Sequence, residues 1–245
     1  MVSRERLCVT GRFGVNVSET TEVAIVAALE REIWPLVKDW PREDRIHDGR
    51  EFRFFRKDRL VAVCGGIGPV AARRAAEAAI VSYRPGVVQS VGFAGALVPT
   101  LRVGEVVMAA RVVDAGDGSS VETGEGTGVL VTSIALAGVE QKGRLARSYG
   151  AGVVDMEAAA VAKAAEARGL RFRALKAISD ENDFALPNVE KFVRPDGRFD
   201  TARFGMHVAM RPWLWFRVFR LATNSSKAAA ALCDRLSELY GLRGV

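Results

Sequence analysis

Short apolar runs that alternate with glycine-rich turns and helix-like segments constrain the fold of this chain more than any other feature. The run at residues 23–28 is too short for a buried helix and is bounded by charged residues, which is typical of a buried strand. Repeated alternation of such strands with helices predicts βαβ units and a mainly parallel sheet. We expect strands at residues 23–28, 52–55, 60–64, 87–91, 104–113, 129–136, 153–154 and 173–178, and helices at 30–39, 69–83 and 158–168.

The length and composition of the chain fit one globular domain. At 245 residues, with 49% hydrophobic and 26% charged residues, it suits a single α/β domain. Residues 1–20 lack a continuous apolar core, so they predict a flexible tail and not a secretory signal. The domain is expected at residues 21–245 and includes an aromatic and basic segment at 204–222. No run reaches the ~18 apolar residues that a membrane span needs.

The cysteines, histidines and charges bear on compartment and partners. Three cysteines without CxxC spacing argue against a disulfide framework and favour a reducing, cytoplasmic compartment. Two histidines argue against a His-ligated centre, so no metal is expected. The net charge of +6 suits either a basic surface that keeps the protein soluble or attraction to phosphate, anionic lipid or nucleic acid. No recognisable nucleic-acid motif frames the basic clusters, so a nucleic-acid partner is not expected.

Two carboxylates stand where an α/β sheet places its site. Glu157 lies between a short strand and a helix, and Asp180 ends the last expected strand. Open α/β sheets bind ligands at the carboxyl ends of their strands, so both are candidate site residues. Structural roles stay open for both, a helix-start acid for Glu157 and a cap or turn residue for Asp180. Glycine-rich turns at 65–68 and 92–96 are expected to form ligand-facing loops.

Five motifs in order resemble the nucleoside phosphorylase and nucleosidase family. The run Asp155-Met156-Glu157 resembles its ribose-binding Met-Glu segment, and Ala177-Ile178-Ser179-Asp180 resembles its strand that ends in a base-protonating aspartate. The other three are Ala28-Leu29-Glu30-Arg31-Glu32, Gly66-Ile67-Gly68 and the block 92–104. The motifs are most similar to those of 5′-methylthioadenosine/S-adenosylhomocysteine nucleosidases. The resemblance implies a single-domain, three-layer α/β/α fold of the nucleoside phosphorylase type with a mixed, mainly parallel central sheet.

The resemblance also implies a role for each motif. Glu157 would accept hydrogen bonds from the ribose hydroxyls, since an ionised carboxylate can accept two at once. Asp180 would protonate the purine at N7 as the glycosidic bond breaks, which requires a buried carboxyl group. Glu32 would orient or activate the attacking water. Met156 would pack on the sugar face, with an ordinary core position as the alternative. The other implied substrate-binding residues are Gly66, Gly68, Phe93, Ala94, Gly95 and Lys176.

Departures from the family pattern bear on the substrate and the nucleophile. Phe93 stands where the family has Ser or Thr, whose hydroxyl helps to hold phosphate in the phosphorylases. Lys176 stands where similar nucleosidases carry Arg, which keeps the charge but loses the bidentate fork. The segment 114–128, rich in Gly, Ser, Thr and Glu, predicts a loop without the helix that relatives insert there. Glu32 and the missing hydroxyl favour water as nucleophile, whereas the basic composition favours phosphate as a co-substrate.

The segment 204–222 is not part of the usual nucleosidase pattern. A helix that starts at Pro212 gathers basic residues on one face and carries Trp215, Phe216 and Phe219 among its apolar residues. Such a helix suits either the core or a dimer interface, or the surface of a membrane. This ending resembles the hopanoid-associated phosphorylases, which implies adenosylhopane, a lipid nucleoside, as the substrate.

Three hypotheses follow from the sequence. In the first, the chain releases adenine from adenosylhopane in hopanoid lipid biosynthesis, by hydrolysis or phosphorolysis. In the second, its substrate is a soluble nucleoside such as methylthioadenosine. In the third, it is a non-catalytic nucleoside-binding protein, which the joint presence of Glu157 and Asp180 disfavours. We expect a cytoplasmic homodimer with peripheral membrane contact, and no cofactor apart from phosphate as a co-substrate.

Overall fold

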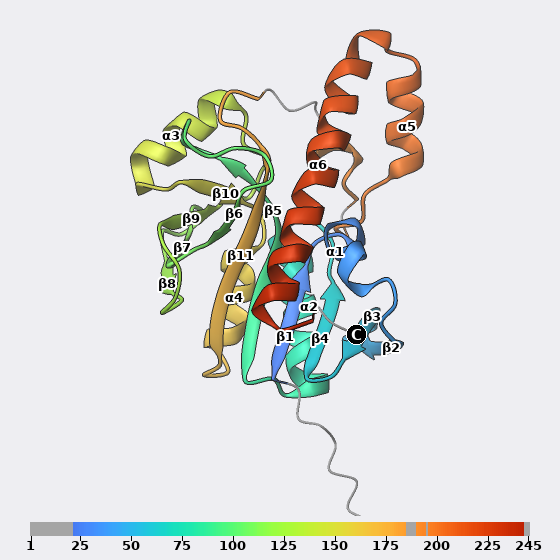
Figure 1. Ribbon diagram of the computed structural model, residues 1–245, viewed down its shortest axis with the longest axis vertical. Helices are drawn as coiled ribbons and strands as arrows, with labels where there is room; N and C mark the ends of the chain where they lie inside the picture. The colour runs from blue at the N-terminus through green and yellow to red at the C-terminus, as the bar shows by residue number, and fades with distance from the viewer. Residues whose placement is uncertain (1–21, 185–189, 195, 243–245) are drawn as a thin grey trace, which may run out of the picture.

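The computed structural model describes residues 22–184, 190–194 and 196–242, and these have the predicted α/β fold with a mixed sheet (Figure 1). The tail expected at residues 1–20 lies outside the described residues. The strands are β1 (Val23–Ala27), β2 (Arg42–His47), β3 (Arg50–Lys57), β4 (Leu60–Cys64), β5 (Val87–Ala96), β6 (Val106–Met108), β7 (Arg111–Asp114), β8 (Ser120–Glu122), β9 (Val129–Thr132), β10 (Val153–Asp155) and β11 (Arg171–Asp180). The helices are α1 (Glu30–Val37), α2 (Pro69–Tyr83), α3 (Val139–Tyr149), α4 (Ala158–Glu166), α5 (Thr201–Ala209) and α6 (Pro212–Leu239).

Parallel pairing holds the centre of the sheet together. β1 lies between β4 and β5, and β5 also pairs with β11, all in parallel. The outer pairs β2–β3, β3–β4 and β7–β8 are antiparallel. The strand order is β2-β3-β4-β1-β5-β10-β9-β7-β8, with β11 beside β5 and β6 beside β11. This order gathers the carboxyl ends of β4, β1, β5 and β11 at one edge of the sheet.

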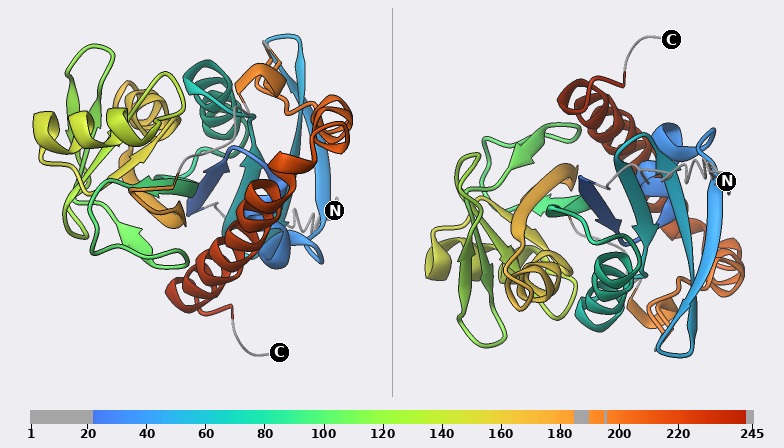
Figure 2. Two further views of the ribbon diagram at one scale, coloured as in Figure 1. Left: turned by 90° about the horizontal axis from the view of Figure 1, so that it is seen from above. Right: turned by 90° about the horizontal axis from the view of Figure 1, so that it is seen from below.

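Helices cover both faces of the sheet (Figure 2). On one face, α2 and α4 pack against each other and on the strands through small side chains such as Ala75, Ala79 and Ala162. On the other face, α1 and the C-terminal half of α6 cover the strands with larger side chains such as Ile33 and Leu232. Apolar surface removed from water in these two layers stabilises the fold by roughly 25 cal/mol per Å².

Residues 92–96 form a strand and not the loop that their glycines predict. They are the carboxyl end of β5, which pairs with β11 and, at Gly95 and Ala96, with β10. Glycine weakens a strand unless neighbouring groups fill the space that its missing Cβ leaves. Here the carboxylates of Glu32 and Asp180 fill that space at Gly92 and Gly95. The predicted loop is therefore a fixed strand against which two of the candidate carboxylates pack.

Other expected elements also differ in the structure. The strand expected at 104–113 is divided into β6 and β7, and the loop expected at 114–128 contains β8, paired with β7. The sequence pattern predicts neither β2 nor α3. β2 is an edge strand whose charged residues are alternately exposed. α3 buries only Lys142 and Leu145 among its residues, so its apolar face is too narrow to produce a periodic signal.

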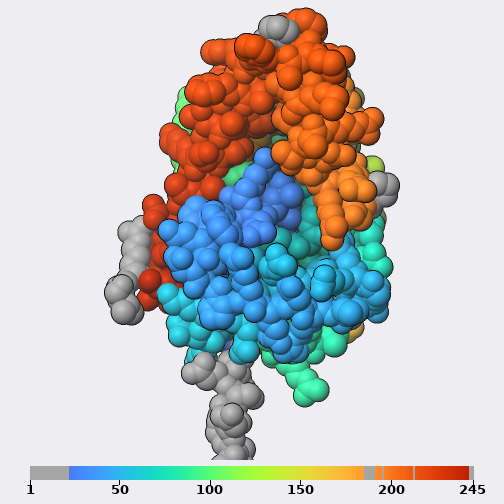
Figure 3. All heavy atoms as spheres, turned by 90° about the vertical axis from the view of Figure 1, so that its right-hand side faces the viewer, coloured from blue at the N-terminus to red at the C-terminus, as the bar shows by residue number. Residues whose placement is uncertain are grey.

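α5 and the first half of α6 form a hairpin, residues 201–221, that stands above the rest of the molecule (Figures 1 and 3). We call this hairpin the arm. α5 buries none of its residues, and the buried residues of α6, from Ala228 to Leu236, lie in its C-terminal half. Phe192 holds the base of the arm through edge-to-face contacts with Phe204 at 5.2 Å and His207 at 5.1 Å between ring centroids. Within the described part of the chain, no helix has the length and apolar composition needed to cross a membrane.

Candidate active site

Asp155 organises the junction at which β10 passes into α4. Its Oδ2 accepts a hydrogen bond from the Ala158 amide at 2.9 Å, and its Oδ1 accepts one from Thr132 Oγ1 at 2.7 Å. Thr132 Oγ1 accepts in turn from the Ala159 amide at 2.9 Å. The first amides of a helix lack partners within the helix, so these bonds satisfy the start of α4. They also hold Glu157, the residue directly before α4, in a defined place.

Glu157 reaches from this junction to the glycine turn before α2. Its Oε1 accepts a hydrogen bond from the Gly68 amide at 2.9 Å. Gly68 has a φ of +94°, which favours glycine, and α2 begins at the following Pro69. Two predicted site residues are thus brought together. The shared edge at which parallel strands end does not explain this contact, because β10 runs antiparallel to β5. Instead, the turn into α4 directs Glu157 towards the β4–α2 turn.

Lys176 is enclosed behind Glu157 and is not open to a ligand. Its Nζ lies 2.8 Å from Asp155 Oδ2, and its side chain is 2% exposed. Burial lowers the pKa of Lys176, but the charges of Asp155 and Glu157 raise it more, so it stays above its usual value. Lys176 therefore supplies a fixed positive charge to the carboxylates around it. The predicted substrate contact is replaced by an indirect, electrostatic role.

The surroundings of Glu157 disfavour its ionised form. Burial and the neighbouring charge of Asp155 raise the pKa of Glu157 to about 7, against the lowering effect of Lys176 and of the Gly68 amide. A carboxylate with this pKa changes charge near neutral pH. Its affinity for donors such as hydroxyl groups therefore depends on pH in the physiological range.

Glu32 is a third buried carboxylate of the same group of charges. Its Oε2 accepts hydrogen bonds from the Ala28 and Leu29 amides, both at 3.1 Å, at the point where β1 passes into α1. Burial raises the pKa of Glu32, although the Leu29 amide and the charge of Lys176 lower it. Among the described residues no group donates a hydrogen bond to its Oε1. That oxygen can accept a proton from a ligand or from water.

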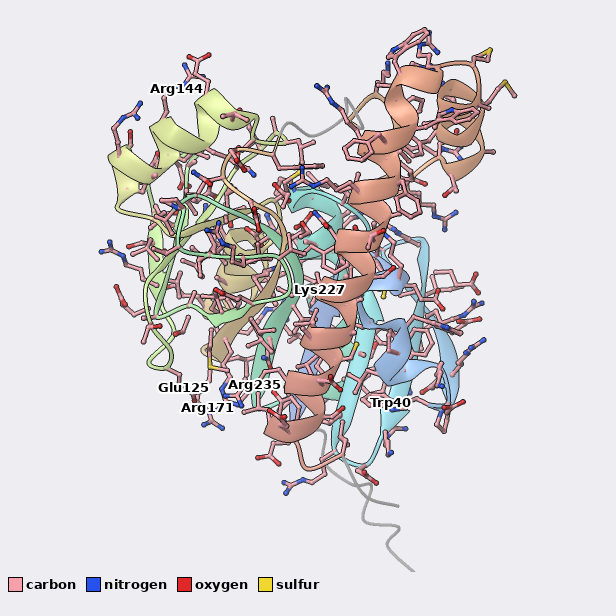
Figure 4. All side chains as sticks on the ribbon, turned by 45° about the horizontal axis from the view of Figure 1, so that its top comes forward. Trp40, Glu125, Arg144, Arg171, Lys227 and Arg235 are labelled. Carbon is pink, nitrogen blue, oxygen red and sulfur yellow. The ribbon has the colours of Figure 1, made fainter. Side chains whose placement is uncertain are left out.

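Asp180 is paired with Lys142 of α3, which the sequence analysis does not predict. Lys142 Nζ donates to Asp180 Oδ2 and, at 2.6 Å, to the carbonyl oxygen of Glu181. Asp180 Oδ1 accepts from Ser179 Oγ at 2.7 Å. The side chains of Lys142 and Asp180 are only 1% and 7% exposed. Arg144, two residues along α3, points outward instead (Figure 4).

β5 makes room for both carboxylates. A Cβ atom on Gly92 would lie 2.8 Å from Glu32 Oε2, and one on Gly95 would lie 2.9 Å from Asp180 Oδ2 and 3.1 Å from Lys142 Cε. Real Cβ atoms do not approach so closely, so any side chain at these positions would displace a carboxylate. The end of β5 therefore needs glycine because the carboxylates pack directly on its backbone.

Comparison with known proteins decides the family of this chain. The model of the phosphorylase superfamily matches residues 22–137 and 127–198. The chain belongs to the phosphorylase superfamily. No curated protein matches the sequence.

Solved structures show where else this superfamily fold occurs. The 5′-methylthioadenosine/S-adenosylhomocysteine nucleosidase of Neisseria meningitidis is 19% identical, with 90% of this chain and 98% of that chain covered and a TM-score of 0.68. The S-adenosylhomocysteine nucleosidase of Streptococcus pyogenes is 18% identical, with 96% and 100% covered and a TM-score of 0.67. The futalosine hydrolase of Helicobacter pylori is 20% identical, with 89% and 98% covered and a TM-score of 0.64.

The remaining residues that the sequence predicts for the site lie at or near β4, β5 and β10. Gly66 packs against Gly197, and its amide donates to the Ala28 carbonyl oxygen at 2.9 Å. Met156 is partly buried next to Glu157. Ala94 is a core residue whose side chain is buried, so any contact that it makes with a ligand would use its backbone. Phe93 is directed towards α1 and α6.

Two cavities open beside the candidate site. One of about 600 Å³ adjoins Gly65 and Gly66 and includes the guanidinium groups of Arg31, Arg50 and Arg198 in its lining. The other, of about 630 Å³, lies between α1, β5 and α6 and exposes more apolar than polar surface. It is lined by Glu30, Arg31, Trp34, Pro35, Phe93, Ala222, Ser225, Ser226 and Ala229.

One group of described residues has the side chains that a cation would need. Ligand atoms of His47, Asp48 and Glu77 lie within 4.8 Å of one another, at the β2–β3 turn and on α2. Glu77 is already paired with Arg73 at 2.9 Å, so the group is part of a surface ion-pair network. It includes none of the residues predicted for the site.

Sequence reasoning misses Lys142, Asp155 and Thr132, which support the predicted carboxylates. The signal for Lys142 is weak but present, since it stands three residues before Leu145 on the buried face of α3. A lysine on an apolar helix face is rarely buried without a partner. Asp155 and Thr132 carry no separate signal, because their importance depends on the parallel pairing of β10 with β9.

Proposed function

We propose that this chain cleaves the N-glycosidic bond of a purine nucleoside and releases adenine. The observation that carries the proposal is the contrast between two enclosed acids. Asp180 is bound to an ammonium and a hydroxyl donor, whereas burial beside Asp155 raises the pKa of Glu157 to about 7. A carboxyl group in contact with an ammonium has a proton donor at hand, whereas a carboxyl group with a pKa of about 7 is partly ionised at neutral pH and then accepts hydrogen bonds. Asp180 protonates the leaving base, and Glu157 binds the sugar hydroxyls.

Water is the proposed nucleophile. Glu32 has one oxygen held by two amides, and burial raises its pKa, which suits a general base. Phe93 has no hydroxyl group with which to hold phosphate. One of the proteins that share this fold is named a hydrolase, which supports the same choice.

Phosphorolysis is the second candidate because of the arginine-lined cavity. Arg50 donates to the Gly65 carbonyl oxygen at 2.6 Å, next to the turn that binds Glu157. Burial and the nearby charge of Arg198 lower the pKa of Arg50, so an anion in this cavity would be favoured. Arginine binds phosphate oxygens through its planar fork. In this alternative, phosphate is the co-substrate.

For the substrate we propose a lipid nucleoside, with adenosylhopane as the specific candidate. The cavity of about 630 Å³ leads from Phe93 on β5 along α6 towards the arm, and most of its exposed surface is apolar. Drug-sized and larger apolar groups bind in cavities of this kind. A polycyclic tail would occupy this cavity while Glu157 and Asp180 hold the nucleoside end.

The arm supports contact with a membrane surface. Its aromatic side chains are among the most exposed of the described residues, with Trp213 72%, Phe216 75% and Phe219 73% exposed. Exposed apolar patches of this kind mark a binding surface. Arg217 is exposed beside them and would contribute on the order of 1 kcal/mol at an anionic surface. Arg211 and Arg220 contribute less, because Arg211 binds the His207 carbonyl oxygen at 3.1 Å and Arg220 lies 5.0 Å from the Phe184 ring.

An adenine-release assay tests the whole proposal. Adenosylhopane and methylthioadenosine are each incubated with the enzyme, with and without phosphate, and free adenine and the sugar product are measured. Adenine release from the lipid nucleoside without phosphate is the expected result. Sugar 1-phosphate formed only when phosphate is present would replace hydrolysis by phosphorolysis. Faster release from methylthioadenosine would replace the lipid by a soluble substrate, and binding without release would indicate a non-catalytic nucleoside-binding protein.

A further inference from the structure

Lys142 and Asp180 form an enclosed pair at the place where the proposed reaction needs a proton. An ion-paired Asp180 holds no proton of its own, because the proton is on the Lys142 ammonium. A base that leaves the sugar as an anion must nevertheless be protonated as its bond breaks. The proton that Asp180 delivers therefore has to come from the donor that it already contacts.

We propose that Lys142 is a positioning residue that supplies this proton to Asp180, an inference that rests on the proposed function. In the first step the Nζ–H bond of Lys142 breaks and an O–H bond forms on Asp180 Oδ2, which leaves a neutral amine beside a carboxylic acid. In the second step this O–H bond breaks as an N–H bond forms on the departing base, which takes the electron pair of the glycosidic bond. Asp180 returns to a carboxylate, and Lys142 regains a proton from water after the products leave.

The geometry around the pair favours transfer over a fixed ion pair. Both side chains are almost fully buried, and Gly95 lets them pack on the backbone of β5 without an intervening group. Low-polarity surroundings disfavour separated charges, so a bound base that displaces water favours the neutral amine and acid. The Glu181 carbonyl oxygen and the Ser179 hydroxyl keep Nζ and the carboxyl group aligned during the transfer.

The other charged groups around the pair already have partners. On the segment after β11, the Glu181 carboxylate faces Arg102 at 3.9 Å. On β10, Asp155 is bound to Lys176, and on α3 itself Glu140 is paired with Arg144 at 3.7 Å. Glu157 and Glu32 belong to the group of charges around Lys176. Among the described residues, Lys142 is therefore the donor that directly contacts Asp180 from outside its own strand.

A purely structural ion pair is the alternative, and chemical rescue separates the two. Lys142→Ala removes the ammonium and leaves a space that a small amine can enter. We expect its kcat to fall about 10²- to 10³-fold with KM changed less than about threefold, as for loss of a proton donor. Ammonium or methylamine should restore kcat in proportion to its concentration, and the basic limb of the pH profile should move with the pKa of the added amine.

Two further variants complete the test. Lys142→Arg keeps the positive charge but not the transferable proton, because guanidinium is not deprotonated in proteins, so it should stay as slow as Lys142→Ala. Lys163→Ala is the matched control, since Lys163 is paired with Asp114 and Asp117 at the surface, at 2.5 and 2.8 Å. It should keep the wild-type kcat and show no response to amines. Thermal melting confirms that each variant is folded.

Each outcome supports or overturns the inference. A folded Lys142→Ala variant that no amine rescues, or one with the wild-type kcat and pH profile, would show that the pair is structural. A wild-type rate in Lys142→Arg would show that charge alone suffices. If the wild-type enzyme releases no base from any nucleoside, the proposed function fails and the relay fails with it. If the wild type is active and Lys142→Ala is unimpaired, the relay alone fails.

Discussion

The carboxylate site and the arm place their functional side chains in opposite surroundings. At the site, Lys176 and Lys142 are each bound to an aspartate within the protein, and the carboxylates pack on the backbone of β5. On the arm, Trp213 and Phe216 are more than two-thirds exposed, and α5 buries no residue at all. The site keeps its charges through fixed internal partners. The arm leaves apolar surface without any internal partner.

Under the proposed function, this difference places the chemistry in one region and the choice of substrate in the other. Buried, paired charges keep their positions whatever is attached to the far end of the substrate, so changes there should affect every nucleoside alike. Exposed apolar side chains gain free energy only when they meet another apolar surface. Changes in the arm should therefore affect only a substrate with a lipid tail. Each prediction below tests this division with one lipid and one soluble nucleoside.

The largest effect is expected for Asp180→Asn. The amide cannot deliver a proton to the base, so kcat should fall by about 10³-fold on both substrates, within the usual range for a general acid. The sequence alone predicts no effect on folding. The structure predicts a loss of about 3 kcal/mol in the free energy of unfolding, because Lys142 would stay buried without its counter-charge.

Urea unfolding and single-turnover kinetics measure the two effects separately. The double variant Asp180→Asn, Lys142→Met removes the unpaired charge and should recover stability but not activity. A wild-type rate in Asp180→Asn would remove Asp180 from the reaction. A difference of more than about tenfold between the two substrates would contradict the division between site and arm.

Glu32→Gln should have the next largest effect if water is the nucleophile. Loss of the general base should lower hydrolysis by about 10²-fold on both substrates, because glutamine cannot accept the proton of water. Hydrolysis in H₂¹⁸O followed by mass spectrometry of the sugar identifies the attacking group. If Glu32→Gln, supplied with phosphate, formed unlabelled sugar 1-phosphate at the wild-type rate, phosphate would be the nucleophile. The arginine-lined cavity would then be favoured as the site that holds it.

Glu157→Gln should lower kcat/KM by roughly 10- to 100-fold, since hydrogen bonds to a charged group contribute about 1.5–3 kcal/mol. The pKa of Glu157, raised to about 7, sets the pH dependence. Below this pH the acid is protonated and accepts hydrogen bonds poorly, so kcat/KM of the wild type should rise as pH increases through about 7. The variant should lack this acid limb. An acid limb of the same midpoint in Glu157→Gln would assign it to Glu32 or another group.

The smallest and most selective effect is expected for replacement of Trp215, Phe216 and Phe219 by Ser. Activity on the lipid nucleoside and binding to anionic liposomes should each fall by about tenfold, as for the net loss of about 1.4 kcal/mol of apolar contact. Activity on methylthioadenosine and the melting temperature should change little, because these side chains are 55–75% exposed.

Ile46→Ser is the matched control for the arm, since Ile46 is 77% exposed on the edge strand β2. It should change neither liposome binding nor activity. If the arm variant lost activity equally on both substrates, the arm would be needed for the reaction of every nucleoside and not for the lipid tail alone. Dissociation of a dimer in the arm variant, measured by light scattering, would mean that the arm binds a second copy of this chain and not lipid.

Sequence pattern was sufficient for the main strands, because buried apolar runs such as residues 23–28 produce a local signal. It also singled out Glu157 and Asp180 as candidates, because acids at the ends of elements stand out from apolar neighbours, whereas Glu32 came only from the family resemblance. In the structure Glu32 and Asp180 pack on β5 and Glu157 binds the Gly68 amide, and their catalytic roles remain predictions. The sequence pattern predicted a loop at residues 92–96, but the structure has a strand there. Its glycines are needed because neighbouring side chains occupy the space where their Cβ atoms would lie.

The chain alone determined the α/β fold, the superfamily motifs and the aromatic and basic composition of the arm, since each depends on residues close together in sequence; the exposure of those aromatic side chains was decided by the structure. Only the tertiary structure decided which partner each charge has. Lys142 and Asp180 are 38 residues apart and Gly68 and Glu157 are 89 residues apart, so no local periodicity connects them. These pairs exist because strand order and the antiparallel pairing of β10 with β5 bring α3, the β4–α2 turn and the end of β11 together. Free energies of buried charges depend on such neighbours, and the neighbours are set by the fold.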